Sequence, residues 1–273
     1  MTPSLVRQLH GTTAPASRAD GRSRARDWAE IQERMLVPLY EAVYERLDVG
    51  PGTRLLGLGC GSGLALLMAA ARGAPVTGVE DAEPERLALA RERLAHSDDG
   101  PRLVEGRPPA TRDGRPYDLV TAFEPVGGAS GDSAGIGELL AEAGPLTRRG
   151  AAVVLAGWGP PERCATASVL RVAGDPQQGS GGRRPAARDG LEEVAERVGL
   201  TPDGSGRVAC PFGYADTDSA VRGLLSTGLF DAAADATDTV QVDKELREAL
   251  HPYERADGTV WMPNVFRYLI ART

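Results

Sequence analysis

The chain has 273 residues, of which 41% are hydrophobic, enough for one large core. Its formal net charge is −7 and its pI is near 5.2, so the chain as a whole does not attract a phosphate backbone. These values exclude nucleic acid as the expected partner and favour a small molecule. The sequence contains no run of 18 apolar residues, and charged residues interrupt its beginning. We therefore expect no membrane contact and a cytoplasmic location.

The cysteines are few and far apart: Cys60, Cys164 and Cys210. Because no two of them form a CxxC pair, the sequence predicts reduced thiols and no metal site. The basic residues are almost all arginine, and Lys244 is the only lysine. Together with abundant Ala and Gly, this bias indicates a GC-rich bacterial coding sequence.

The first half of the chain reads as an irregular segment followed by alternating strands and helices. Residues 1–26 show no apolar period, which predicts a flexible arm. Apolar residues at helical spacing then predict a helix over 27–47, with a possible interruption at Pro38. Strands are expected at 53–58, 75–79, 102–104, 117–123 and 151–156, and helices at 64–71, 84–94 and 136–143. This alternation predicts an α/β protein with a doubly wound, parallel-type sheet.

The second half predicts covering segments as well as the end of the sheet. Residues 174–190 contain five glycines, two prolines and two glutamines, the composition of an exposed linker or a flexible lid. A helical insertion is expected around 215–260, with helices at 218–225 and 243–250. Helices at 163–172 and 191–198, a strand at 207–210 and an edge or closing strand at 265–271 complete a domain over 27–273.

The sharpest motif is the run LLGLGCGSG at 55–63, which lies between an expected strand and an expected helix. Alternate glycines at Gly59, Gly61 and Gly63 allow a tight turn and a close approach of the backbone to a ligand. Glu80, 17 residues after Gly63, ends the second strand, where a carboxylate can accept hydrogen bonds from two ribose hydroxyls. The combination predicts an adenosine site at the switch point of a parallel sheet.

A dinucleotide site is the nearest competing interpretation, because it also combines a strand, a glycine-rich turn and a distal acid. Its GxGxxG spacing fails here: Gly59 and Gly61 would require a glycine at Leu64, and Gly57 and Gly59 would require one at Ser62. A turn that binds no ligand is the second alternative.

At these residues the chain resembles class I methyltransferases that use S-adenosylmethionine (SAM), in particular bacterial small-molecule methyltransferases. The resemblance rests on DWAEI at 27–31, RLLGLGCGSG at 54–63, VTGVE at 76–80, YDLV at 117–120, GWGPPER at 157–163 and NVFRY at 264–268. It implies a Rossmann-like sheet of seven strands whose final strand is antiparallel. It also implies that residues 59–63 hold the methionine and ribose of SAM and that Glu80 holds the ribose.

Combining the motif with the resemblance gives a set of expected cofactor-binding residues: Leu58, Gly59, Cys60, Gly61, Gly63, Glu80, Asp81, Arg107 and Phe123. Two positions depart from the family pattern. Gly57 stands where the family carries an acid that organises the methionine end of SAM, and Arg107 stands near the place of an acid that contacts adenine. A guanidinium accepts no hydrogen bond, so Arg107 cannot replace the acid near adenine. Together, the departures at Gly57 and Arg107 favour a second interpretation, a non-catalytic ligand-binding or regulatory protein.

Candidates for an acceptor pocket are the aromatic residues that could line an apolar cavity, together with the acid after Phe123: Trp28, Tyr40, Glu124, Trp158 and Tyr214. Methyl transfer relies mainly on alignment of donor and acceptor, so a base is needed only where the acceptor must lose a proton. His251 is the candidate base, since histidine titrates near neutrality. An ordinary surface histidine and core aromatic residues are the competing interpretations. The function expected from the resemblance is methyl transfer to a small molecule of secondary metabolism; modification of a protein or nucleic acid is disfavoured by the acidic charge.

Overall fold

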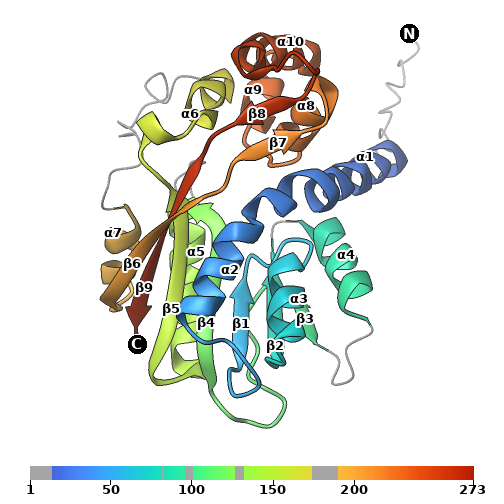
Figure 1. The fold of residues 1–273 in the computed structure, drawn as a ribbon. Helices are drawn as coiled ribbons and strands as arrows, with labels where there is room; N and C mark the ends of the chain where they lie inside the picture. Colours follow the sequence, from blue (N-terminus) through green and yellow to red (C-terminus); the bar gives the residue numbers. More distant parts are fainter. Residues whose placement is uncertain (1–13, 82, 96–100, 127–131, 174–189) are drawn as a thin grey trace, which may run out of the picture.

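A computed structural model describes residues 14–81, 83–95, 101–126, 132–173 and 190–273. Within these residues, seven strands form one sheet with helices on both faces (Figure 1). In spatial order the strands are β3 (Arg102–Glu105), β2 (Val76–Glu80), β1 (Leu55–Leu58), β4 (Tyr117–Val126), β5 (Thr147–Trp158), β9 (Val265–Arg272) and β6 (Thr201–Ala209). The predicted α/β class and the seven-stranded sheet are confirmed.

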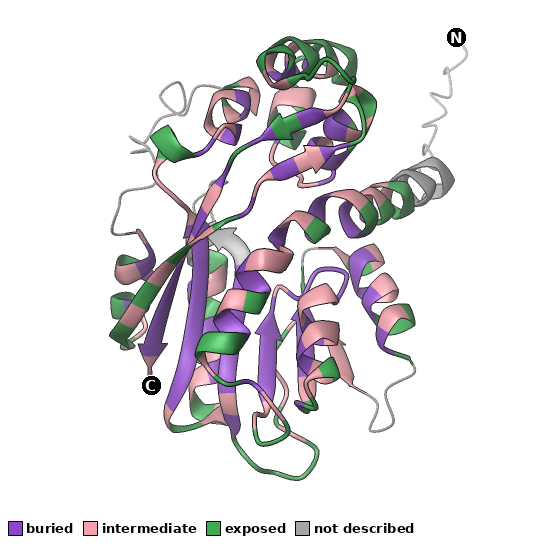
Figure 2. Ribbon diagram, in the orientation of Figure 1, coloured by how far each residue is buried: buried purple, intermediate pink, exposed green. Residues whose placement is uncertain are grey.

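The direction of the strands fixes which edge of the sheet carries a site. Strands β1 to β5 pair in parallel, and β9 is antiparallel to both of its neighbours, β5 and β6. We expected 265–271 to be an edge or closing strand; it lies inside the sheet, and β6 forms the edge. The accessibility of β6 alternates along the strand, whereas β1 is buried throughout (Figure 2). Burial on both faces explains why β1 is a continuous apolar run.

The helices form two layers. Residues of α2 (Val37–Arg46), α3 (Leu64–Ala71) and α4 (Pro84–Leu94) join one apolar cluster against one face of the sheet, and those of α5 (Asp132–Ala143) and α7 (Gly190–Arg197) join a second cluster. In α3 and α4 the predicted bounds coincide with the observed ones. The layers leave the carboxyl ends of the parallel strands open to the covering segments.

The amino-terminal region differs from the prediction of a flexible arm. Residues 1–13 lie outside the described residues, but α1 (Ala14–Asp27) is a helix. Alanine and arginine are good helix formers even without an apolar stripe, and ion pairs hold the helix in place. Arg24 bonds both Glu83 and Asp231, and Arg22 lies 3.8 Å from Glu85. Contacts with partners distant in sequence therefore replace the apolar pattern that the prediction required.

The helix expected over 27–47 is helical throughout but irregular in its first part. A π turn, η1 (Trp28–Gln32), leads into a 3₁₀ turn, η2 (Glu33–Leu36), and then into α2. Pro38 sits in the first turn of α2, where a missing backbone N–H does no harm. The irregular turns precede the proline and place Trp28 and Glu33 in buried positions.

A helical insertion between β6 and β9 covers the carboxyl edge of the sheet (Figure 1). It contains β7 (Phe212–Tyr214), α8 (Thr217–Leu225), α9 (Asp231–Ala236), α10 (Thr239–Leu250), η6 (His251–Tyr253) and β8 (Val260–Met262). Strands β7 and β8 pair as a small antiparallel sheet. Asp216 and Asp238 cap α8 and α10, because each carboxylate accepts a backbone N–H in the first turn at 2.7 Å. The predicted helices thus exist, with α10 beginning earlier than expected.

One other segment differs from the prediction, and another lies outside the described residues. The helix expected at 163–172 is divided into η4 (Pro161–Arg163), α6 (Thr166–Val169) and η5 (Leu170–Ala173), and η3 (Gly144–Leu146) precedes β5. Residues 174–189 of the expected linker or lid lie outside the described residues. Among the helices that the structure describes, none has the length and apolar character to cross a membrane.

Candidate functional site

The loop after β1 turns on glycines with left-handed backbone. Gly59, Gly61 and Gly63 have φ values of 60°, 55° and 81°, a region that residues with a Cβ avoid. Gly63 also allows two helices to approach, since a Cβ there would lie 3.0 Å from Ala90 Cβ. Gly63 lines neither cavity described below; it precedes the first residue of α3 and lets α4 pack closely.

Glu80, at the end of β2, is directed at this loop. Its side chain is buried, and its Oε2 accepts a 2.7 Å hydrogen bond from the backbone N–H of Gly61. Parallel pairing of β1 with β2 brings the two segments to the same edge of the sheet. The carboxylate also lines the large cavity, so it is within reach of a ligand there.

The large cavity has a volume of about 690 Å³, which is the size of a small-molecule site. Predicted residues found in its lining are Trp28, Leu58, Gly59, Glu80, Asp81, Arg107 and Trp158. Aromatic residues of the insertion boundary, Phe212 and Phe266, form another part of the wall. The ring centroids of Trp158 and Phe266 are 4.6 Å apart, and Phe212 stands edge-on to Trp158. One part of this cavity is therefore acidic and next to the glycine loop, and another part is aromatic.

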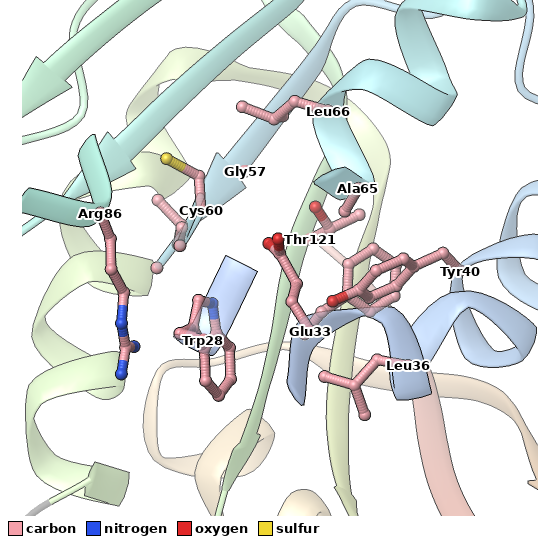
Figure 3. A pocket seen from close by; sticks show the side chains of 14 residues that line it. Trp28, Glu33, Leu36, Tyr40, Gly57, Cys60, Ala65, Leu66, Arg86 and Thr121 are labelled. Atoms are coloured by element: carbon pink, nitrogen blue, oxygen red, sulfur yellow. The ribbon is translucent and has the colours of Figure 1, made fainter. Parts of the chain in front are cut away.

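A second, much smaller cavity of about 20 Å³ lies beside the same loop (Figure 3). Predicted residues in its lining are Trp28, Tyr40, Leu58, Gly59, Cys60, Gly61 and Phe123. Tyr40 packs on Phe123 with ring centroids 4.8 Å apart. The two cavities share Trp28, Leu58 and Gly59, so they adjoin each other across the loop.

Glu33 ties the amino-terminal helical segment to the glycine loop. Its side chain is 3% exposed, and its Oε2 accepts hydrogen bonds from Ser62 Oγ and, at 2.8 Å, from Arg93 Nη1. Among the described residues, its Oε1 accepts only a long bond of 3.3 Å, from the backbone N–H of Leu64. Since α3 begins at Leu64, the carboxylate sits at the positive end of that helix.

Trp28 lies between Arg86 and the glycine loop. The Arg86 guanidinium stacks on the indole at 4.2 Å from the ring centroid, and its Nη2 donates to the carbonyl oxygen of Ser226 at 2.7 Å. The indole Nε1 is buried and has no hydrogen-bond partner among the described residues. Figure 3 shows the indole between Arg86 and Glu33. A buried donor without an acceptor is costly, so a ligand or water that accepts from it would stabilise this arrangement.

An acid at position 57, as in the family pattern, would require Leu66 to shift. A Cβ built on Gly57 would lie 2.9 Å from Leu66 Cδ2 and 3.7 Å from Thr121 Oγ1. Leu66 Cδ2 is the end of a flexible side chain, and Gly57 lets it pack directly against β1.

The remaining predicted residues are Tyr214, His251, Arg107 and Glu124. Tyr214 lines neither cavity and donates to Gln32 Oε1 in the core, and His251 is an exposed residue of η6 beside Glu254. The structure therefore gives no support to His251 as a base. Arg107 lines the large cavity, but its side chain is 86% exposed and pairs with Glu142. The side chain of Glu124 lies outside the described part of the chain.

Cys60 lies in the glycine loop, close to two acidic side chains. Burial, together with the negative charges of Glu80 and Glu33, raises the pKa of the Cys60 thiol far above its usual range. This thiol is a packed, protonated group.

Among the described residues, no group of three or more His, Cys, Asp or Glu side chains is arranged to hold a metal ion.

Sequence reasoning missed several residues of the site: Gln32, Glu33, Arg86, Phe212, Leu229 and Phe266. Glu33 and Arg86 look like surface charges of amphipathic helices, and only contacts distant in the sequence bury them.

The strand order, the glycine loop and the acid after β2 together define the fold of class I SAM-dependent methyltransferases. The structure is similar to a SAM-dependent methyltransferase from Thiobacillus denitrificans in complex with S-adenosyl-L-homocysteine, with a TM-score of 0.53 and 17% identity over 93% of this chain and 98% of that one. It is also similar to YjhP from E. coli, with a TM-score of 0.52 and 21% identity over 92% and 99% of the two chains.

A third similar structure is the [4+2]-cyclase SpnF, with a TM-score of 0.50 and 17% identity over 86% of this chain and 80% of that one. No family profile matches the amino-acid sequence, and no curated protein is similar to it in sequence. At these identities the likeness establishes the fold, and the activity has to be argued from the site.

Proposed function

We propose that this protein binds SAM and transfers its methyl group to a small-molecule acceptor. The observation that carries the proposal is the buried Glu80 carboxylate, held beside the glycine loop and exposed to a cavity of about 690 Å³. A carboxylate at the end of the second strand suits a ribose, because it can accept from both hydroxyls.

The residues present fit the cofactor. Gly59 and Gly61 offer backbone without side chains, Glu80 offers the ribose acceptor, and Asp81 lines the cavity next to it. The buried Trp28 Nε1 supplies a donor that lacks a protein acceptor among the described residues. When bound, SAM supplies an electrophilic methyl group on a sulfonium sulfur. The chain's own residues would hold the two reactants in line and keep water out.

The acceptor proposed is a small molecule with an apolar or aromatic part. Trp158, Phe212 and Phe266 form a wall that suits such a group, and the cavity volume is in the range of small-molecule sites. The resemblance to bacterial small-molecule methyltransferases further supports secondary metabolism in the bacterial cytoplasm. No histidine is among the described lining residues, so alignment in the cavity is the main contribution we assign to the protein.

A second candidate function is ligand binding without methyl transfer. Gly57 favours it, since the strand lacks the acid that the family uses near the methionine end. The similarity to a protein named as a [4+2]-cyclase also illustrates that this fold supports other chemistry.

Isothermal titration calorimetry with SAM and with S-adenosyl-L-homocysteine tests the proposal. We expect both ligands to bind, with a dissociation constant weaker than about 1 μM for at least one. NAD is the matched control and should give no heat, because the glycine spacing does not suit a dinucleotide. No heat with either SAM compound at millimolar concentration would overturn SAM binding. Binding without S-adenosyl-L-homocysteine formation across a panel of phenols, carboxylic acids and amines would favour the second function.

A further inference from the structure

We infer that Glu33 and Trp28 together recognise the amino-acid end of the cofactor, with Glu33 replacing the acid that position 57 lacks. In this assignment Glu33 Oε1 accepts from the ammonium group, and Trp28 Nε1 donates to the carboxylate group. The inference rests on the proposed function, since it concerns the methionine end of SAM. It differs from the family pattern because the acid comes from the helical segment before β1.

The first support is the state of the Glu33 carboxylate. Oε2 accepts from Ser62 Oγ and Arg93, whereas Oε1 has, among the described residues, only the long contact with the Leu64 N–H. A carboxylate oxygen has two lone pairs, so Oε1 retains acceptor capacity. Glu33 lines the small cavity, and Oε1 would lie 3.2 Å from a Cβ at Gly61.

The second, independent support is the Trp28 indole. Its Nε1 is buried without a partner among the described residues, and it would lie 3.1 Å from the same Cβ position at Gly61. One donor and one acceptor thus converge on the same glycine from the helical segment before β1. An α-amino acid carries both complementary groups on a single carbon, so its zwitterion matches this pair.

The small cavity has room for one of the two polar groups, the ammonium at Glu33, while Trp28 also lines the adjoining large cavity. At about 20 Å³, the small cavity exceeds the roughly 10–15 Å³ needed for one water molecule. It shares Trp28, Leu58 and Gly59 with the large cavity that Glu80 lines. A ligand whose ribose lies on Glu80 therefore has a polar neighbouring space for its other end. Since residue 57 is a glycine, the strand itself provides no acid at this position.

Glu33 would also compensate the charge of the ammonium group. Arg93 is the cation paired with Glu33, but it also donates to Ser62, and its side chain is 23% exposed. A buried ammonium is stabilised by an adjacent carboxylate and is costly without one. The competing explanation is that Glu33 only fastens the helical segment to the loop.

Two ligands separate these explanations: S-adenosyl-L-homocysteine and 5′-methylthioadenosine, which lacks the amino-acid end. Both are titrated calorimetrically into the wild type, Glu33→Gln, Trp28→Phe and the control Glu30→Gln. Glu30 is an exposed acid on the same turn and lines neither cavity. Thermal unfolding of each variant checks that it folds.

We expect Glu33→Gln to weaken the binding of S-adenosyl-L-homocysteine about tenfold or more and to leave the affinity for methylthioadenosine within about twofold of the wild type. Trp28→Phe keeps an aromatic ring and removes the N–H. It should also lower the affinity for S-adenosyl-L-homocysteine relative to the affinity for methylthioadenosine. Glu30→Gln should match the wild type. Equal losses for both ligands, or no loss for either, would overturn the assignment and leave a fastening role. If Glu33→Gln does not fold, the relative affinity of Trp28→Phe for the two ligands decides between the explanations. Failure of the wild type to bind either ligand would instead overturn the proposed function and the assignment with it.

Discussion

Replacement of Glu80 by alanine tests the centre of the site, because this side chain has a structural role and a proposed ligand-binding role. In the folded protein Oε2 accepts from the Gly61 N–H at 2.7 Å, and the side chain is 3% exposed. The substitution removes that acceptor and the proposed acceptor of the ribose hydroxyls. It therefore changes both the stability of the loop and the affinity for the cofactor.

The two effects can be estimated separately. Loss of a hydrogen bond to a charged group costs about 1.5–3 kcal/mol, which corresponds to about a tenfold to a hundredfold loss of SAM affinity. The Gly61 N–H, left without its acceptor, should lower the free energy of unfolding by about 1–3 kcal/mol. Glu105→Ala is the matched control, since Glu105 pairs with Glu80 in the register of β2 and β3 but is exposed and lines neither cavity.

Calorimetry with SAM and urea unfolding without ligand measure the two quantities. We expect Glu80→Ala to lower both the SAM affinity and the free energy of unfolding. Glu105→Ala should leave these two quantities near the wild-type values. A folded Glu80→Ala protein with unchanged SAM affinity would refute the ribose role. Unchanged stability would show that water replaces the lost acceptor of the Gly61 N–H.

Gly63→Ala should destabilise the protein by about 2 kcal/mol in urea unfolding, because its φ is 81° and the new Cβ would meet Ala90; Gly114→Ala, with φ of 70° and open space, should cost less. An equal cost for the two would mean that the contact with Ala90 relaxes freely. The raised pKa of Cys60 predicts that stability is full below about pH 8.5, where the unfolded thiol is protonated, and falls as the pH rises further. Alkylation of Cys60 at pH 9 should therefore need urea; rapid labelling of the folded protein would contradict this. Arg24→Gln should speed amide exchange in α1, as measured by mass spectrometry, and unchanged exchange would show that its ion pairs do not hold the helix.

The parts of the fold that the sequence predicted are those determined by neighbours along the chain. Helices α3 and α4 have the expected bounds. An apolar period marks their extent, and Gly63 before α3 and Pro84 in the first turn of α4 mark where they begin. Glu80 was predicted from its place at the end of the second strand, 17 residues after Gly63. For the two helices, the physical cause lies within a few residues of the element it determines.

The parts that were missed depend on contacts between distant segments. β6 includes Pro202 and Gly204, which read locally as a turn, yet eight residues pair with β9 across a register shift. Glu33 looks like an ordinary helical acid until Arg93 and Ser62 surround it. His251 illustrates the opposite error, because a residue type suited to chemistry lies exposed on the insertion. Local pattern carries no information about such burial.

The position of β9 between β5 and β6 has a consequence for biosynthesis. As a ribosome makes the chain, β6 emerges before the insertion, and its only strand neighbour in the described sheet, β9, is made after it. During that interval both β5 and β6 have backbone groups without their final partners, and such edges attract other chains. The speed with which the insertion is translated and folds therefore sets how long the nascent protein is at risk of aggregation.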